Sequence, residues 1–252
     1  MVPDEQRGRA RKRIQWLAGI PETPMRREAF FGQLLRYGLD DACSLLETLV
    51  RDTLHKRKPA VESYQVLLAP ERVVESIRRD RLEMMLDRAR ELRLYAAALW
   101  LLMPLGRDDA NEDIVASTLL HRDLREMTLG HRRSLARNAR GDTLQKLLTD
   151  PDPVVVDRLL ANPSVTESQV LAVAARRPTV TVALERVIDS PWIRRYRIQS
   201  ALAQNPYLHA KRAAALLPLL NRRDLRAVAR DSTLSVSLRE SAQHLSAMWD
   251  MA

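Results

Sequence analysis

The sequence has few of the residues that β-sheets and tight loops depend on. Aromatic residues make up only 4% of the 252 positions, and there are 7 glycines against 13 prolines. Strands favour aromatic side chains, and hairpin turns favour glycine. Leu, Ala and Arg are abundant instead, and proline suits the first turn of a helix but breaks its interior. We therefore predict an all-α protein in which prolines separate the helices.

The sequence also lacks recognisable residues for catalysis or for binding a cofactor. Cys43 is the only cysteine, which excludes an internal disulfide and a cysteine-based zinc or iron–sulfur site within one chain. The five histidines (55, 121, 131, 209 and 244) do not fall at a metal-ligand spacing, and neither a glycine-rich phosphate loop nor GxSxG occurs. We predict a protein without catalytic residues, metal or cofactor, and a single free cysteine fits a reducing, cytoplasmic compartment.

No apolar run is long enough to cross a membrane. The most apolar segment, residues 94–105 (LYAAALWLLMPL), is shorter than the ~20 residues of a transmembrane helix. The basic N-terminal segment is not followed by the apolar stretch of a secretory signal. The sequence therefore predicts a soluble protein without a membrane span.

Positive charge is in excess and is concentrated in one segment. The formal net charge is +9, and 36 of the 41 basic residues are Arg. A coding bias would explain Arg in place of Lys, but it would not explain the excess itself. Residues 191–230 contain one acid, Asp224, and nine basic residues: Arg194, Arg195, Arg197, Lys211, Arg212, Arg222, Arg223, Arg226 and Arg230. Such a segment suits an acidic partner, either protein or nucleic acid.

The first half of the chain is predicted to form irregular helices. One helix is expected over residues 4–18, a second over 23–37, and a third after Asp40 and Asp41, which can cap it. The polar segment 107–113 (RDDANED) leads into a further helix around residues 115–120. We therefore predict a helical N-terminal region, 1–110, and a repeat array, 111–252, which could be continuous with it.

The second half repeats a pattern of helix, Asn or Asp, turn and helix. Three phrases align, SLARNARGDTLQKLL (134–148), RLLANPSVTESQVLAVAA (158–175) and SALAQNPYLHAKRAAALL (200–217), and AVARDSTLSVSLRESAQHL (227–245) follows them. Their Asn or Asp residues are 24, 43 and 26 positions apart, so the long gap fits a degenerate unit at 174–191. Units this short must stack on their neighbours to bury an apolar face. We expect an α-solenoid.

The recurring asparagines are predicted to be structural. An Asn at a helix end tolerates the left-handed conformation and bonds nearby backbone groups, and a following Pro stops the helix. This applies to Asn138, Asn162 and Asn205. Thr166 and Gln169 form a predicted capping pair for the helix that follows Asn162.

The repeat segment resembles the leucine-rich repeat variant, a HEAT-like bacterial repeat with a period near 24 residues. Asp150-Pro151-Asp152-Pro153 and Ala161-Asn162-Pro163 stand in the register of its DPDxxVR…AxNPxxxxxxLxxLA pattern. The resemblance covers roughly 129–245 and implies a right-handed superhelix of short helices that presents a recognition surface. Some members of that family carry a cysteine-bound iron–sulfur cluster, whose ligands this chain lacks.

The predicted function is that of a non-enzymatic adaptor that binds an acidic protein surface. The partner-binding residues are predicted to be Trp192, Arg194, Arg195, Arg197, Arg222, Arg223 and Arg226. Three alternatives remain: the arginines are simply solvated while Trp192 seals the packing of adjacent repeats; the same surface binds nucleic acid; or the chain is an enzyme. For the last, the WIRR phrase distantly resembles HEAT-like alkylpurine DNA glycosylases, but their Trp-x-x-x-Asp pattern is absent.

Overall fold

Every element in the described part of the chain is helical. The computed structural model describes residues 3–105 and 119–250, and no strand occurs among them, which confirms the all-α class. The helices there are all too short or too polar to cross a membrane. The chain forms two compact units: the first contains Met1–Asp108, Ala214–Arg230 and Val236–Ala252, and the second Asp109–Ala213 and Asp231–Ser235. Residues 106–118 are outside the described part of the chain. They include the predicted linker at 107–113, the predicted boundary at 110 and most of the helix predicted at 115–120.

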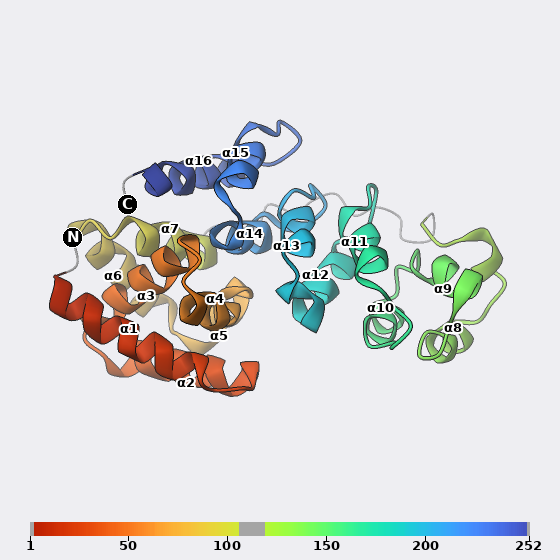
Figure 1. Cartoon of the computed structure of the whole chain (residues 1–252), viewed down its shortest axis with the longest axis horizontal. Coiled ribbons are helices and arrows are strands. Elements are labelled where there is room, and N and C mark those ends of the chain that lie inside the picture. Colours follow the sequence, from red (N-terminus) through yellow and green to blue (C-terminus); the bar gives the residue numbers. More distant parts are fainter. Residues whose placement is uncertain (1–2, 106–118, 251–252) are drawn as a thin grey trace. The chain divides into compact units, whose positions relative to one another are not determined.

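The first unit is built around α3. Its N-terminal part comprises α1 (Asp4–Ala18), α2 (Thr23–Arg36), α3 (Leu39–Leu54), α4 (Lys58–Tyr64), η1 (Gln65–Leu67), α5 (Pro70–Ser76), α6 (Arg79–Glu91) and α7 (Tyr95–Leu105) (Figure 1). The first two helices confirm the predicted bounds to within one residue. The prediction that Asp40 and Asp41 cap the third helix is wrong, because α3 begins at Leu39 and both acids lie inside its first turn. Helices α1, α4, α6 and α7 all pack against α3, which is buried along almost its whole length.

Buried polar groups on α3 find partners in neighbouring helices. Glu47 accepts hydrogen bonds from Arg51, one turn away, and from the backbone N–H of Ala97 in α7 at 2.9 Å. Asp52 receives a two-pronged hydrogen bond from Arg11 of α1. A buried carboxylate without such donors would be costly, so these contacts make a nearly enclosed α3 possible.

The C-terminal segment completes the first unit. Residues 213–220 are buried, and they include η5 (Leu217–Leu219). The Tyr64 hydroxyl donates to the carbonyl of Ala215 at 3.0 Å. The Lys56 ammonium donates to the last carbonyls of this segment, including those of Leu219 at 2.6 Å and Leu220 at 2.7 Å. These bonds satisfy carbonyls at the end of a helical turn, and they join residues about 160 apart in the sequence.

Two further helices end the chain in this unit. Helix α15 (Arg222–Arg230) packs against α16 (Val236–Asp250), and its buried residues are Leu225 and Val228. The predicted array runs unbroken to residue 252, whereas contacts group these helices with the N-terminal region. Periodicity could not reveal this, because long-range contacts at Lys56 and Tyr64 decide the grouping.

The second unit is a succession of short helices. They are η3 (Arg122–Leu124), α8 (Leu129–Leu135), α9 (Gly141–Leu147), α10 (Pro153–Leu160), α11 (Glu167–Ala175), α12 (Thr181–Asp189), η4 (Pro191–Arg194) and α13 (Tyr196–Ala203), and α14 (Ala210–Leu216) follows (Figure 1). Helix α10 packs against α8 and α12, and α11 packs against α12 and α13. The segment predicted as a degenerate repeat, 174–191, contains the end of α11, the whole of α12 and the start of η4.

Two of the recurring asparagines, each at the end of a helix, form side-chain hydrogen bonds to the end of a helix earlier in the chain. The Asn162 side-chain amide donates to the carbonyls of Ala136 and Ala139, both at 3.0 Å. The Asn205 amide donates to those of Ala174 at 2.8 Å and Arg176 at 3.0 Å. Both asparagines are buried, and their side-chain oxygens accept from the backbone two residues ahead. The predicted structural role of these two residues is confirmed.

The other predicted local features of the repeats differ in how fully they form. Gln169 accepts from the backbone N–H of Thr166 at 2.9 Å, which confirms the capping pair. Asn138 is exposed and shows only the backbone turn of the series, with its N–H bonded to the carbonyl of Leu135. The turn that Asn138 shares with Asn162 and Asn205 is therefore local, while the side-chain bond needs a preceding helix end.

Candidate binding surface

Trp192 is used in packing inside the second unit. Its indole N–H donates to the carbonyl of Leu160, the last residue of α10, at 2.9 Å, and the residue is half-buried. The ring therefore holds η4 against the end of α10. This is the packing role that the sequence analysis gave as an alternative for Trp192, and it uses the indole N–H, the polar group of the ring.

The arginines after Trp192 do not lie on one continuous helix. The 3-10 helix η4 ends at Arg194 and α13 begins at Tyr196, because the backbone of Arg195 between them is extended with φ −84° and ψ 120°. On a helix, Ile193 and Ile198 would be about 140° apart, so both could not face one core. Because the backbone is extended at Arg195, both isoleucines are buried. The Gln199 side-chain amide donates across this break to the carbonyl of Ile193 at 2.8 Å.

The break leaves three arginines on the surface of the second unit. Arg194, Arg195 and Arg197, here called the η4–α13 set, are all exposed. Arg195 is 3.6 Å from Glu167 in a mostly solvated ion pair. Tyr196, between two of these arginines, is 38% exposed. Arg212, although part of the basic segment, is buried and paired with Asp189 at 3.3 Å, so it adds nothing to the exposed charge.

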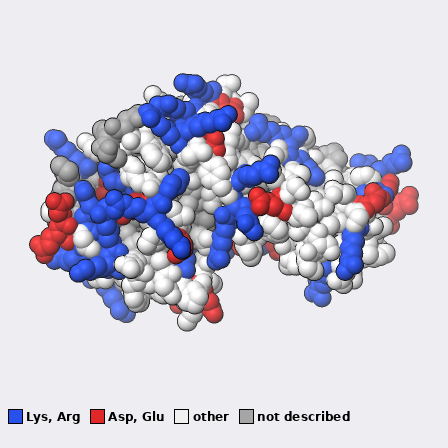
Figure 2. Space-filling view, viewed as in Figure 1, with Lys and Arg blue, Asp and Glu red and all other residues white. Residues whose placement is uncertain are grey.

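The arginines of α15 gather on one face. Arg222, Arg223, Arg226 and Arg230, here called the α15 set, are exposed, whereas Leu225 and Val228 are fully buried. With about 100° of rotation per residue, the four arginines fall within an arc of about 100°. Asp224 lies well outside that arc. Figure 2 shows Lys and Arg side chains gathered over α15 at the top of the view.

Elsewhere in the described residues, many arginines have carboxylate partners. Arg11, Arg51, Arg88, Arg132 and Arg133 each lie within 3 Å of an acid. The ion pairs found among the described residues include none for Arg223, Arg226 or Arg230. A carboxylate or phosphate from another molecule could therefore bond to these guanidinium groups without displacing a partner.

The structure thus divides the predicted surface. Trp192, Arg194, Arg195 and Arg197 belong to the second unit, while Arg222, Arg223 and Arg226 belong to the first. The sequence prediction also omitted Arg230 from the surface, although its spacing of four residues from Arg226 signals the same helical face. The α15 set is the larger of the two, because it carries four arginines on one helix.

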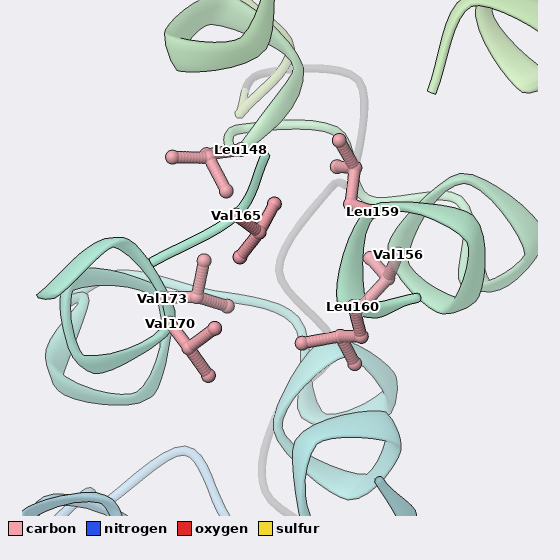
Figure 3. A pocket seen from close by; sticks show the side chains of 7 residues that line it. All are labelled: Leu148, Val156, Leu159, Leu160, Val165, Val170 and Val173. Carbon is pink, nitrogen blue, oxygen red and sulfur yellow. The ribbon is translucent and has the colours of Figure 1, made fainter. Parts of the chain in front are cut away.

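Other candidate sites in the described residues have structural explanations. Burial raises the pKa of the Cys43 thiol to about 12, and the side chain is fully enclosed. The described residues hold no group of His, Cys, Asp and Glu suited to a metal ion. A cavity of about 10 Å³ lies among Leu148, Val156, Leu159, Leu160, Val165, Val170 and Val173 of the second unit (Figure 3). It is an apolar packing gap, since a water there would lack polar partners.

Comparisons with known proteins give no relative for this chain: no protein-family model matches it, and no characterised protein or solved structure is significantly similar.

Proposed function

We propose that the protein is a non-enzymatic adaptor that binds an acidic protein partner through the α15 set. The supporting observation is the α15 face itself, with four exposed arginines opposite two fully buried apolar residues. Guanidinium groups suit carboxylates because both are planar and can form paired hydrogen bonds. Binding of this kind is sensitive to salt, since the charges are solvated before contact.

In this proposal the second unit serves as a HEAT-like scaffold of the leucine-rich repeat variant type. Its support is the pair of equivalent bonds from Asn162 and Asn205 to earlier helix ends, together with the packing of α10 on α8 and α12. The η4–α13 set would extend the recognition surface of that scaffold. We place the protein in the cytoplasm, where its single free thiol would stay reduced.

Nucleic-acid binding is the second candidate function, and Tyr196 is the observation in its favour. An exposed ring between Arg195 and Arg197 could stack on a base while the guanidinium groups contact phosphates. Because Trp192 is half-buried and its N–H is bonded, Tyr196 would be the main stacking ring of this site.

Two charge-reversal variants compare the two arginine sets. We would make Arg223→Glu with Arg226→Glu in the first unit and Arg194→Glu with Arg197→Glu in the second, and measure binding to fluorescent poly-L-glutamate and to 20-nucleotide DNA, at about 50 and 200 mM salt. We expect poly-L-glutamate to bind the wild type, and the α15 variant to lose at least tenfold in affinity while the second-unit variant loses less.

The matched control is Lys12→Glu with Arg36→Glu, which makes the same charge change at exposed positions of the first unit. It should lose under threefold in affinity. Helicity and Tm of all variants should equal those of the wild type; unfolding of the α15 variant would mark its arginines as structural and overturn the proposal. DNA binding with a steep salt slope, and no binding of poly-L-glutamate, would replace it with the second candidate.

A further inference from the structure

The α15 set has a regular spacing that limits the shape of its ligand. Arg222, Arg226 and Arg230 follow one another at intervals of four residues, so successive side chains start about 6 Å apart along the helix axis. Arg223 lies beside this row. Leu225 and Val228 pack toward α16, so the row projects away from that helix.

We infer that the ligand of this row is an acidic α-helix with carboxylates at positions i, i+4 and i+8. This inference rests on the proposed function. A helix with Glu at intervals of four repeats its charges every ~6 Å, and its charge row turns about the axis at the same rate as the arginine row. All three carboxylates can then meet a guanidinium group at once.

The remaining surface of α15 also suits a helix. Ala227 is exposed next to the row, and its small side chain allows a partner backbone to come close. Rows of residues four apart are inclined about 26° to a helix axis, so two such rows run alongside each other when the helix axes cross at about −50°. The geometry therefore specifies an orientation as well as a charge pattern.

Nucleic acid fits this particular face less well. The exposed face of α15 carries no aromatic ring, so a single strand would gain no base stacking there.

Two 17-residue peptides of identical composition test the inference. One carries Glu at i, i+4 and i+8 in a helix-forming Ala/Gln background, and the other places the same three Glu two residues apart, which suits an extended strand. Fluorescence anisotropy with the full chain at low salt should show at least tenfold tighter binding of the first peptide.

Exchanging the charges of Arg226 and the central Glu of the peptide tests whether these two residues contact each other. Arg226→Glu should weaken binding of the first peptide at least tenfold, and replacing the central Glu of the peptide by Lys should restore binding to that variant. Arg226→Gln, which removes the charge with little risk to folding, should give an intermediate loss. Arg36→Glu is the control and should bind both peptides like the wild type.

The possible failures distinguish the two proposals. Equal binding of both peptides, lost in Arg226→Glu, would overturn the acidic helix but support an acidic partner at α15. Binding of neither peptide and no binding of poly-L-glutamate would overturn both. Retained binding in Arg226→Glu would show that the peptide contacts another surface, and would overturn the inference.

Discussion

The two units solve the problem of burying short helices in different ways. In the first, one helix, α3, is enclosed by its neighbours, and polar groups far apart in the sequence bond across the core, such as Lys56 and the carbonyls of 218–220. In the second, each helix packs mainly on helices one or two positions away, and buried asparagines bond to earlier helix ends. The first unit thus depends on long-range contacts, and the second on a local contact that recurs.

The largest effect should come from the asparagine bonds of the second unit. Asn205→Ala removes three hydrogen bonds: the two that the amide donates to the carbonyls of Ala174 and Arg176, and the one that the side-chain oxygen accepts from the Tyr207 N–H. We expect a loss of about 3 kcal/mol in the free energy of unfolding of this unit. Urea denaturation, with hydrogen exchange of α11 and α13, measures it.

Asn138→Ala is the control, because Asn138 is exposed and its cost should stay within about 0.5 kcal/mol. Asn205→Asp separates the two roles of the side chain: it keeps the acceptor for the Tyr207 N–H but loses the donor. If the Asp variant were as stable as wild type, the turn, and not the bond to the earlier helix end, would carry the stability.

The corresponding bond in the first unit is that of Lys56. Lys56→Met removes the hydrogen bonds to the carbonyls of Pro218, Leu219 and Leu220, and we expect the first unit to lose about 1–2 kcal/mol. Lys58→Met is the control, since Lys58 is exposed at the start of α4. Equal losses in both variants would argue against a role for these carbonyls.

The same lysine predicts a dependence on pH. Lys56 is exposed as a residue, but its ammonium faces three carbonyls, and the loss of water there lowers the pKa of Lys56 from 10.5 to about 8. Between these values the unfolded chain holds more protons than the folded one, so this group makes stability rise from pH 8 to 10.5. The slope of unfolding free energy against pH over that range should be smaller in Lys56→Met.

A smaller effect is expected at Trp192. Trp192→Phe keeps an aromatic ring but removes the N–H that donates to Leu160, so the second unit should lose about 1 kcal/mol. Affinity for poly-L-glutamate should stay unchanged. A loss of affinity without a loss of stability would instead return Trp192 to the binding surface.

A substitution that destabilises the second unit is expected to have no effect on the opening of the first unit. Cys43 is fully buried and its pKa is raised to about 12, so a thiol reagent at pH 8 should label it only when the first unit opens. Asn205→Ala should leave the labelling rate unchanged, whereas Lys56→Met should increase it. Faster labelling in Asn205→Ala would mean that the units unfold together.

Local patterns in the sequence were sufficient for much of the fold. The apolar spacing and the terminating glycine predict α1 to the residue, and Thr166 with Gln169 predicts a cap that forms. They were insufficient around Trp192, where the backbone is extended at Arg195 and Ile193 and Ile198 are both buried as a result. Of the candidate surface, the arginines could be named from the sequence, but their division between two units could not, and Arg230 was left out.

By itself the sequence determined the all-α class, most helix bounds in the first 54 residues and the turns at Asn162 and Asn205, because each follows from residues within one or two turns of each other. The tertiary structure alone decided that residues 214–220 complete the N-terminal core and that the two asparagines bond to earlier helix ends. Those outcomes depend on buried donors and acceptors that meet across more than 20 residues of chain, and such pairs leave no periodic signal.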